Sequence, residues 1–276
     1  MTGDDAQACE GVRIAALADL RARLGMPVTP GAPVASAIPH LLITDPAGGW
    51  VAVDGSGLVA GFAQVALREG LWILAQLFVS PATQGAGTGR RLLNRAVEHG
   101  PAAAAGLIAS SPDARAISLY GRLDGFELHP AVSASGTIDR SQLAGEPGVR
   151  EGSGADLDFA AELDRRLRGG PHGPDLEHLI DSGAQLLVLP DRGYAIAEAE
   201  GPGIVAATDP AAGIALLREC LARTSGPASM RRITAGQQWA IRTALDLGME
   251  LRPWGPLFTR GSGAATGAYL SHPAFC

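Results

Sequence analysis

The residues most suggestive of chemistry form a glycine-rich turn, Gln84-Gly85-Ala86-Gly87-Thr88-Gly89-Arg90-Arg91. The turn lies between an apolar stretch at 71–79, which predicts a strand, and an amphipathic stretch at 88–99, which predicts a helix. Backbone N–H groups at the positive end of a helix dipole attract anions, and glycine lets a phosphate approach the backbone closely. The turn therefore predicts an anion pocket that a pyrophosphate could enter.

Two common nucleotide-binding loops do not fit this turn. The dinucleotide pattern G-x-G-x-x-G fails, because its third glycine would fall at Arg90 when counted from Gly85, or at Leu92 when counted from Gly87. The Walker loop requires a lysine, but all 22 basic residues of the chain are arginine. The absence of lysine also excludes Schiff-base chemistry.

A second motif follows at Ala116-Ile117-Ser118-Leu119-Tyr120-Gly121-Arg122-Leu123-Asp124-Gly125-Phe126. The strand that ends in Val79-Ser80-Pro81, the Gln-x-x-Gly-x-Gly turn and this downstream segment together resemble the GNAT superfamily of acyl-CoA N-acyltransferases. The resemblance covers roughly residues 48–130, and the two motifs occur in the order found in that family. The chain is therefore identified as a GNAT relative. In the second half, the stretch 204–212 occupies the corresponding place after a strand but has no glycine-rich turn, and the chain thus resembles tandem GNAT proteins with a degenerate C-terminal half.

The resemblance implies acetyl-CoA as the cofactor and no metal. The pantetheine arm would pair with the backbone at the end of strand 71–79, and the loop amides would hold the pyrophosphate. The cofactor-binding residues implied are Phe78, Val79, Gln84, Gly85, Ala86, Gly87, Thr88, Gly89, Arg90 and Asp113. Asp113 stands where many relatives have asparagine. The Val79 N–H would stabilise the oxyanion, and Tyr120 would be the general acid that protonates the CoA thiolate.

The general base is not identified by the motifs. Some relatives carry a carboxylate on the strand equivalent to 71–79, but the only polar side chain here is Gln76, which cannot act as a base. Water could remove the proton, or a residue from the second half could do so. The candidates there are Glu151, Asp164 and His172.

Two functions follow from these residues. The first is an N-acetyltransferase in which a primary amine of a small substrate attacks acetyl-CoA directly in a ternary complex. The alternative is a non-catalytic protein that binds or senses acyl-CoA. Tyr120 favours the enzyme, whereas the missing strand carboxylate favours the sensor.

Periodicity predicts the elements that would position these residues. In the first half we expect helices at 12–25, 88–99 and 113–123, a loop at 27–39, and strands at 49–53, 58–67, 71–79, 103–110 and 126–129. In the second half we expect helices at 156–167, 175–182, 210–223 and 235–247, and strands at 185–189, 193–198, 203–208, 230–234 and near 256–259.

This order of elements predicts an α/β (α+β) fold with two GNAT-like domains. Each would be a mixed, mostly antiparallel sheet flanked by helices, with a splayed central strand pair. Residues 1–140 would form the catalytic domain that binds acetyl-CoA. Residues 150–276 would form a degenerate domain that contributes to the substrate site, and 141–154 is the expected linker.

Composition limits the partners. The chain has 276 residues, 46% of them hydrophobic, and a formal net charge of −6. An acidic chain without a basic block is unlike a nucleic-acid-binding protein, and no apolar run reaches the length needed to span a membrane. Three widely spaced cysteines and an acidic N-terminal segment predict a cytoplasmic protein. We expect a monomer or homodimer whose partner is a small amine.

Overall fold

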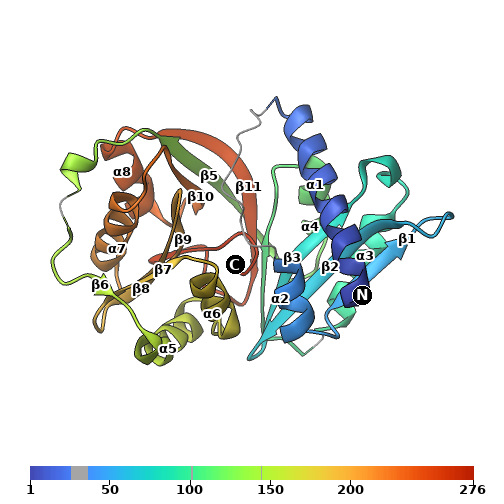
Figure 1. The fold of residues 1–276 in the computed structure, drawn as a ribbon, viewed down its shortest axis with the longest axis horizontal. Coiled ribbons are helices and arrows are strands. Elements are labelled where there is room, and N and C mark those ends of the chain that lie inside the picture. The colour runs from blue at the N-terminus through green and yellow to red at the C-terminus, as the bar shows by residue number, and fades with distance from the viewer. Residues whose placement is uncertain (26–36, 101, 144) are drawn as a thin grey trace. The chain divides into compact units, whose positions relative to one another are not determined.

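The computed structural model describes residues 1–25, 37–100, 102–143 and 145–276. Their contacts divide the chain into two compact units (Figure 1). Unit 1 comprises Met1–Leu67 and Trp72–Ala103, and unit 2 comprises Arg68–Leu71 and Ala104–Cys276.

Unit 1 is built on three consecutive strands in the order β1-β2-β3. The elements are α1 (Ala6–Arg23), α2 (Ala37–Thr44), β1 (Gly49–Val53), β2 (Val59–Arg68), β3 (Leu71–Val79) and α3 (Thr88–Glu98), with short 3-10 turns at Gly3–Asp5 and Pro81–Thr83. Apolar side chains of these strands are buried on both faces of the sheet. Helices must therefore cover both sides.

The register between β1 and β2 shows which helices cover which face. Val51 pairs with Phe62, and Phe62 packs in a buried cluster with residues of α1 and α2. The neighbouring pair is Trp50 with Ala63, and the Trp50 ring contacts His99 at the end of α3. Successive side chains of a strand point to opposite faces, so α1 and α2 cover one face and α3 covers the other.

Unit 2 contains four neighbouring antiparallel strands that join segments far apart in the sequence. These strands are β4 (Ala105–Ala109), β11 (Glu250–Arg260), β5 (Glu127–Gly136) and β10 (Ala228–Thr234), in that spatial order. The helix α4 (Ala114–Tyr120) connects β4 to β5. Thus β11 lies between β4 and β5, and residues on both sides of the expected linker share one sheet.

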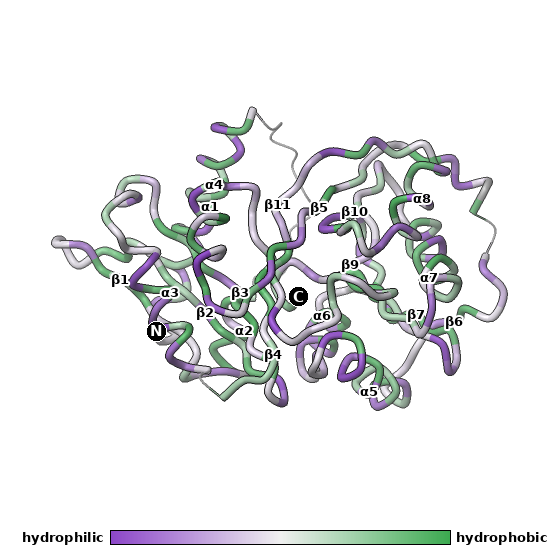
Figure 2. Tube along the Cα trace, turned by 180° about the vertical axis from the view of Figure 1, so that it is seen from behind, coloured by the Kyte–Doolittle hydropathy of each residue, from purple (hydrophilic) through white to green (hydrophobic). Residues whose placement is uncertain are grey.

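The second sheet of unit 2 is an antiparallel meander, β12-β9-β8-β7-β6. Its strands are β6 (Arg150–Glu151), β7 (Gln185–Leu189), β8 (Gly193–Glu198), β9 (Gly201–Ala207) and β12 (Tyr269–Leu270), and the helices are α5 (Leu157–Arg168), α6 (Pro174–Asp181), α7 (Pro210–Ala222) and α8 (Gln238–Asp246). Short 3-10 turns lie at Arg140–Gln142 and Gly154–Asp156. The buried helix α7 packs against β8 and β9. In Figure 2, α5 alternates hydrophobic and hydrophilic positions, as an amphipathic helix does.

The short segment Arg68–Leu71, which belongs to unit 2, makes polar contacts within that unit. The guanidinium of Arg68 forms two hydrogen bonds with the buried Asp175 carboxylate, at 2.8 and 2.9 Å. Glu69 pairs with Arg165 at 2.6 Å, and Gly70 O accepts from Ala105 N. Burial strengthens the Arg68 pair relative to an exposed ion pair.

Most predicted elements are present, with several differences. The strands at 49–53, 71–79, 185–189 and 193–198 have the predicted bounds. The predicted loop at 27–39 is wrong for 37–39, which begin α2, and its remaining residues lie outside the described part of the chain. The expected linker contains β6, and β11 is longer than predicted. The division into 1–140 and 150–276 remains a prediction, while the compact units of the structure are grouped differently.

Candidate active site

The glycine-rich loop joins the end of β3 to α3 within unit 1. Gly85 and Gly87 have φ angles of +88° and +79°, a conformation that side-chain-bearing residues rarely adopt. Gly87 is the N-cap of α3, and no side chain caps this helix end. The first N–H groups of an 11-residue helix are therefore available to an external acceptor.

Two guanidinium groups lie beside this helix end. A Cβ placed on Gly87 would lie 3.7 Å from Arg91 Nη1 and 3.8 Å from Arg90 Nη2, whereas a Cβ on Gly85 would meet no atom within 4 Å. Arg91 donates to Ala86 O at 3.3 Å and to Thr88 Oγ1 at 3.1 Å. An open backbone, an uncapped helix end and two cations suit a pyrophosphate. The loop therefore fits the phosphates of a coenzyme A group.

The end of β3 is tied both to this loop and to β2. Gln84 Nε2 donates to Val79 O at 3.0 Å, and the Phe78 ring stacks on Phe62 at 5.7 Å. A Cβ on Gly61 would lie only 2.9 Å from Phe78 O. Glycine at position 61 thus lets β2 approach the end of β3, a requirement that the motifs did not reveal.

Tyr120 lies at the end of α4 in unit 2. Its side chain is 6% exposed, and its ring packs edge-on against Phe258 with centroids 5.8 Å apart. Within the described residues the Tyr120 hydroxyl has no hydrogen-bond partner. Burial, followed by the charge of Asp113, raises the pKa of Tyr120, so the hydroxyl remains protonated at neutral pH. A protonated hydroxyl without a partner is a suitable proton donor.

Asp113 forms hydrogen bonds and an ion pair with Arg115, two residues further along the chain. It is the N-cap of α4 and accepts from Arg115 N at 2.9 Å. Its other carboxylate oxygen pairs with Arg115 Nη2 at 2.8 Å. Helix capping therefore explains why an aspartate stands at this position. The expected contact of Asp113 with the cofactor remains a prediction.

Asp164 and His172, two of the candidate bases, lie together in the interior of unit 2. Asp164 Oδ2 is 2.7 Å from His172 Nδ1, and Asp164 Oδ1 accepts from the Tyr194 hydroxyl at 2.6 Å. Both side chains of the dyad are 0% exposed. Burial lowers the pKa of His172, and the charge of Arg168 lowers it further. Burial opposes ionisation of Asp164, but its charged and hydrogen-bonding neighbours outweigh burial and lower its pKa.

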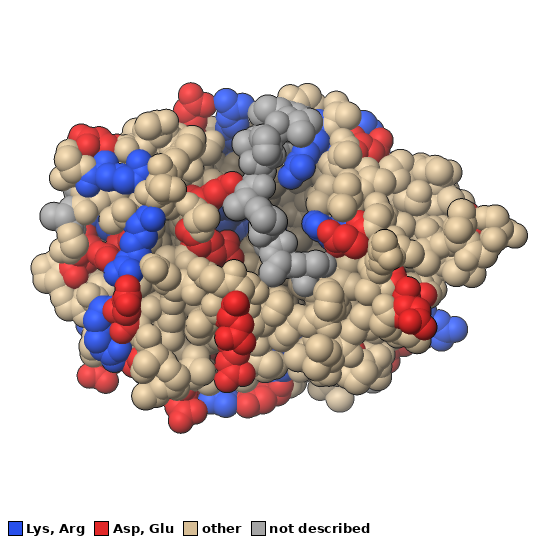
Figure 3. All heavy atoms as spheres, in the orientation of Figure 1, with Lys and Arg blue, Asp and Glu red and all other residues tan. Residues whose placement is uncertain are grey.

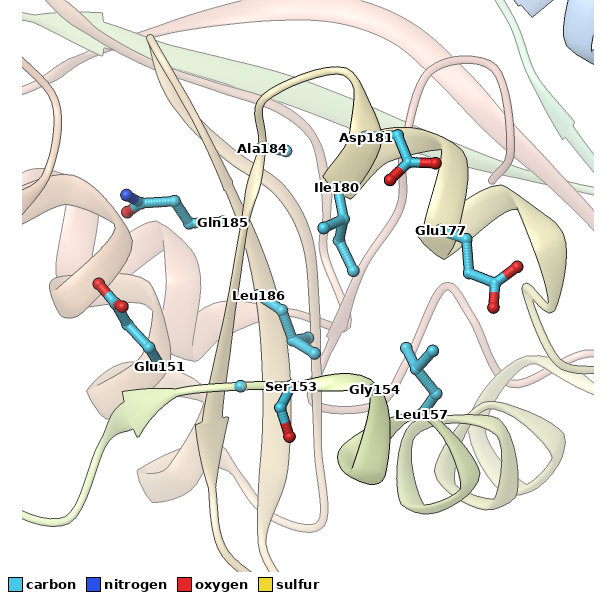
Figure 4. Close-up of a pocket in the computed structure, with 11 residues that line it drawn as sticks. Glu151, Ser153, Gly154, Leu157, Glu177, Ile180, Asp181, Ala184, Gln185 and Leu186 are labelled. Carbon is cyan, nitrogen blue, oxygen red and sulfur yellow. The ribbon is translucent and has the colours of Figure 1, made fainter.

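The third candidate base, Glu151, has a different environment. Its side chain is 70% exposed and pairs with Arg223 at 2.9 Å. Glu151 also lines a pocket of about 500 Å³ in unit 2, with the carboxylates of Glu177 and Asp181 on α6 (Figure 4). This pocket includes no other residue that the sequence singled out.

Figure 3 shows arginine and acidic side chains interspersed over one face. No described helix combines the length and the apolar character required to cross a bilayer.

Comparisons with known proteins give a family. Residues 45–127 match the family described as the acetyltransferase (GNAT) domain. No curated protein matches the chain. A solved structure from Pyrococcus horikoshii, assigned as an acetyltransferase, aligns over 99% of this chain and 93% of its own, with a TM-score of 0.79 and 16% identity.

Two further structures align over nearly the whole chain. A GCN5-related N-acetyltransferase from Sphaerobacter thermophilus has a TM-score of 0.53 and 16% identity, with 92% of each chain covered. A tandem GNAT protein from the clavulanic acid biosynthesis pathway also has a TM-score of 0.53 and 16% identity, covering 94% of this chain and 96% of that one. The family match includes both the glycine-rich loop and Tyr120, and residues 45–127 therefore form a GNAT acetyltransferase domain.

Proposed function

We propose that this chain is an N-acetyltransferase that moves an acetyl group from acetyl-CoA to a primary amine of a small substrate. The GNAT domain itself implies acyl transfer from acetyl-CoA. The observation that carries the proposal is the α3 N-terminus, where Gly85 and Gly87 leave an uncapped helix end open beside two guanidinium groups. Phosphate groups bind such helix ends through the backbone N–H groups and the helix dipole.

The proposed cofactor-binding residues keep the roles implied by the motifs. The loop from Gln84 to Arg90 binds the pyrophosphate, and the backbone of Phe78 and Val79 pairs with the pantetheine arm. Gln84 supports this arrangement because it links the loop to Val79 O. Asp113 would contact the cofactor from the start of α4, where its side chain caps the helix.

The reaction requires one bond to form and one to break. The neutral amine nitrogen attacks the thioester carbonyl carbon, the C–N bond forms and the C–S bond breaks. The nitrogen loses one proton, and the departing sulfur gains one. Tyr120 would donate the proton to sulfur, and the Val79 N–H would stabilise the negative charge that develops on the carbonyl oxygen. The raised pKa of Tyr120 supports its role as an acid.

Two measurements test the proposal. Isothermal titration calorimetry with acetyl-CoA should show binding, and a thiol-detecting assay should show CoA release that depends on a primary amine. Binding without CoA release across a broad panel of primary amines would instead support the acyl-CoA sensor. The missing strand carboxylate is the feature that favours this second candidate. No acetyl-CoA binding would contradict both functions.

A further inference from the structure

The strand β10, at the edge of its sheet in unit 2, contains a bulge of two arginines. The register of β10 against β5 shifts between Met230 and Ile233, so Arg231 and Arg232 stand opposite the single residue Ser133. Arg232 has a φ angle of +60°, which a residue with a side chain rarely adopts. Met230 and Ile233 pack in the same buried cluster, although side chains three positions apart on a regular strand point to opposite faces. The bulge thus adds Arg232 as an extra residue, and bulges of this kind re-aim a side chain.

The two arginines of this bulge have opposite surroundings. Arg231 is exposed and pairs with Glu200 at 3.5 Å. Arg232 is 8% exposed, and its Nε and Nη1 atoms have no hydrogen-bond partner among the described residues. Burial lowers the pKa of Arg232 to about 10, so the guanidinium remains charged at neutral pH. A buried charge is costly without a counter-ion, and the described part of the chain supplies none for Arg232.

Solvent reaches the Arg232 guanidinium at one of its three nitrogens. Nε and Nη1 are buried, whereas Nη2 is neither fully enclosed nor hydrogen-bonded to a described residue. An edge of the planar guanidinium that includes Nη2 therefore offers one accessible and one buried nitrogen to an incoming acceptor. A carboxylate fits such an edge with two parallel hydrogen bonds and supplies the single negative charge that Arg232 lacks.

The neighbours of Arg232 connect it to the proposed general acid within unit 2. The charge of Arg232 interacts with the buried thiol of Cys276, and the same thiol lies against the backbone N–H of Ala109 on β4. Phe258 of β11 pairs with the residue before Ala109, and its ring packs edge-on against Tyr120. Arg232 and Tyr120 are therefore joined through contacts at the end of β4.

A second buried arginine interacts with Cys276 but differs in access and charge balance. Arg168 of α5 is fully buried and donates to Phe275 O at 2.9 Å. Its Nε and Nη1 atoms also lack partners, but its charge attracts the ionised carboxylate of Asp164, four residues earlier on the same helix. Arg232 is thus the cation of this pair that a ligand can reach.

We propose that Arg232 binds a carboxylate of the acceptor, so that the substrate is a primary amine that also carries a carboxylate, as an amino acid does. This inference rests on the proposed function. The amine would be acetylated, and the carboxylate would be the group by which the substrate is selected. An amine without a carboxylate would leave Arg232 unpaired, so the site discriminates against it.

The first test compares amines that differ only in a carboxylate, and it needs no variant. Lysine is paired with cadaverine, and tyrosine with tyramine; glucosamine 6-phosphate and glucosamine test a phosphate instead. We expect kcat/KM to be at least about tenfold higher for the carboxylate-bearing member of the preferred pair, because a hydrogen bond to a charged group is worth that much. Equal values within each pair, or a preference for the phosphate alone, would overturn the inference.

Arg232→Met removes the charge and every donor but keeps a long, unbranched side chain. We expect the KM for the carboxylate-bearing amine to rise at least about tenfold. The KM values for the carboxylate-free amine and for acetyl-CoA should change less than about twofold, because neither contacts Arg232. Arg231→Met, in the same bulge but exposed, is the matched control and should keep all three wild-type values.

The melting temperature distinguishes this role from a structural one. Arg232→Met should melt at or above the wild-type temperature, because it removes a buried charge that has no counter-ion. A lower melting temperature with an unchanged KM would show that Arg232 serves folding, and the inference would be wrong. If Arg232→Met fails to fold, Arg232→Lys replaces it; this variant keeps the charge but loses the planar fork, and it should raise the same KM by a smaller factor.

The outcomes also separate this inference from the proposed function. Acetylation of amines with and without a carboxylate at equal kcat/KM would refute the carboxylate site and leave the acetyltransferase function intact. If the wild type binds no acetyl-CoA, or releases no CoA with any of the amines, the acetyltransferase function fails and the inference fails with it.

Discussion

Asp164 and His172, eight residues apart in the sequence, share a hydrogen bond of 2.7 Å in the fully buried interior of unit 2. The backbone N–H of His172 donates to the same carboxylate oxygen at 3.0 Å. Tyr194 satisfies the other oxygen. The Asp164 carboxylate thus takes part in three hydrogen bonds. The network joins α5 to β8 and to the segment before α6.

This network predicts a loss of stability in mild acid. The pKa of His172 is lowered in the folded state, chiefly by burial, so the unfolded chain takes up a proton first as the pH falls below about 6.5. The stability due to neutral His172 is present above that pH and is lost below it. We expect the free energy of unfolding to fall by up to about 1.4 kcal/mol per pH unit below pH 6.5. Urea denaturation at several pH values between 7.5 and 5.5 measures this change in the free energy of unfolding.

The control for the acid effect is His172→Gln, which removes the titrating group. Its free energy of unfolding should be lower at pH 7.5 but should depend less on pH. Equal pH slopes for the wild type and the variant would show that another group causes the acid effect.

The buried ion pair between Arg68 and Asp175 predicts a large cost when one partner is removed. The pair is bidentate, and the two side chains are almost inaccessible to solvent. Asp175→Asn should lower the free energy of unfolding by about 3–5 kcal/mol, because the buried charge of Arg68 would lose the carboxylate that binds it with two hydrogen bonds. The double variant Arg68→Met with Asp175→Leu should recover part of that loss. Denaturant unfolding of the wild type, Asp175→Asn and the double variant checks this, and a change below about 0.5 kcal/mol for Asp175→Asn would contradict it.

Tyr120→Phe should separate catalysis from folding. Removing a general acid lowers kcat by about 10²–10⁴-fold. The melting temperature should stay unchanged, because the hydroxyl has no partner within the described residues. Calorimetry should show the wild-type affinity for acetyl-CoA. A kcat within about threefold of the wild type would exclude Tyr120 as the acid.

Gly87→Glu should weaken acetyl-CoA binding by at least about tenfold, since it adds a negative charge beside the pyrophosphate and a side chain at a φ of +79°. Gly57→Glu is the matched control. Gly57 has a φ of +84° in the turn between β1 and β2, with no atom within 4 Å of its Cβ position. Both variants bear the same kind of backbone strain, but only Gly87→Glu should change the dissociation constant measured by calorimetry. Equal affinities in the two variants would contradict the loop assignment.

Local sequence pattern determined the secondary structure around the candidate site. The strand at 71–79 has its predicted bounds, and the helix predicted at 88–99 is observed at Thr88–Glu98. Glycine spacing and apolar periodicity are patterns of a few neighbouring residues, so they predict secondary structure without knowledge of distant contacts. For the same reason, the glycine-rich loop could be singled out from the sequence. Tyr120 was singled out by the resemblance of its segment to the GNAT superfamily, and the family match covers both the loop and Tyr120.

Only the tertiary structure decided which distant segments pair. The insertion of β11 between β4 and β5, the contact of Asp164 with His172 and the pairing of Arg68 with Asp175 join residues eight to more than a hundred positions apart. Strand order and buried ion pairs depend on packing across the whole unit, and the local periodicity of a strand does not specify its neighbour. The side-chain oxygens of Gln64 and Gln76 are buried and have no hydrogen-bond partner among the described residues. The sequence could not predict this, because burial and hydrogen bonding are properties of the folded chain.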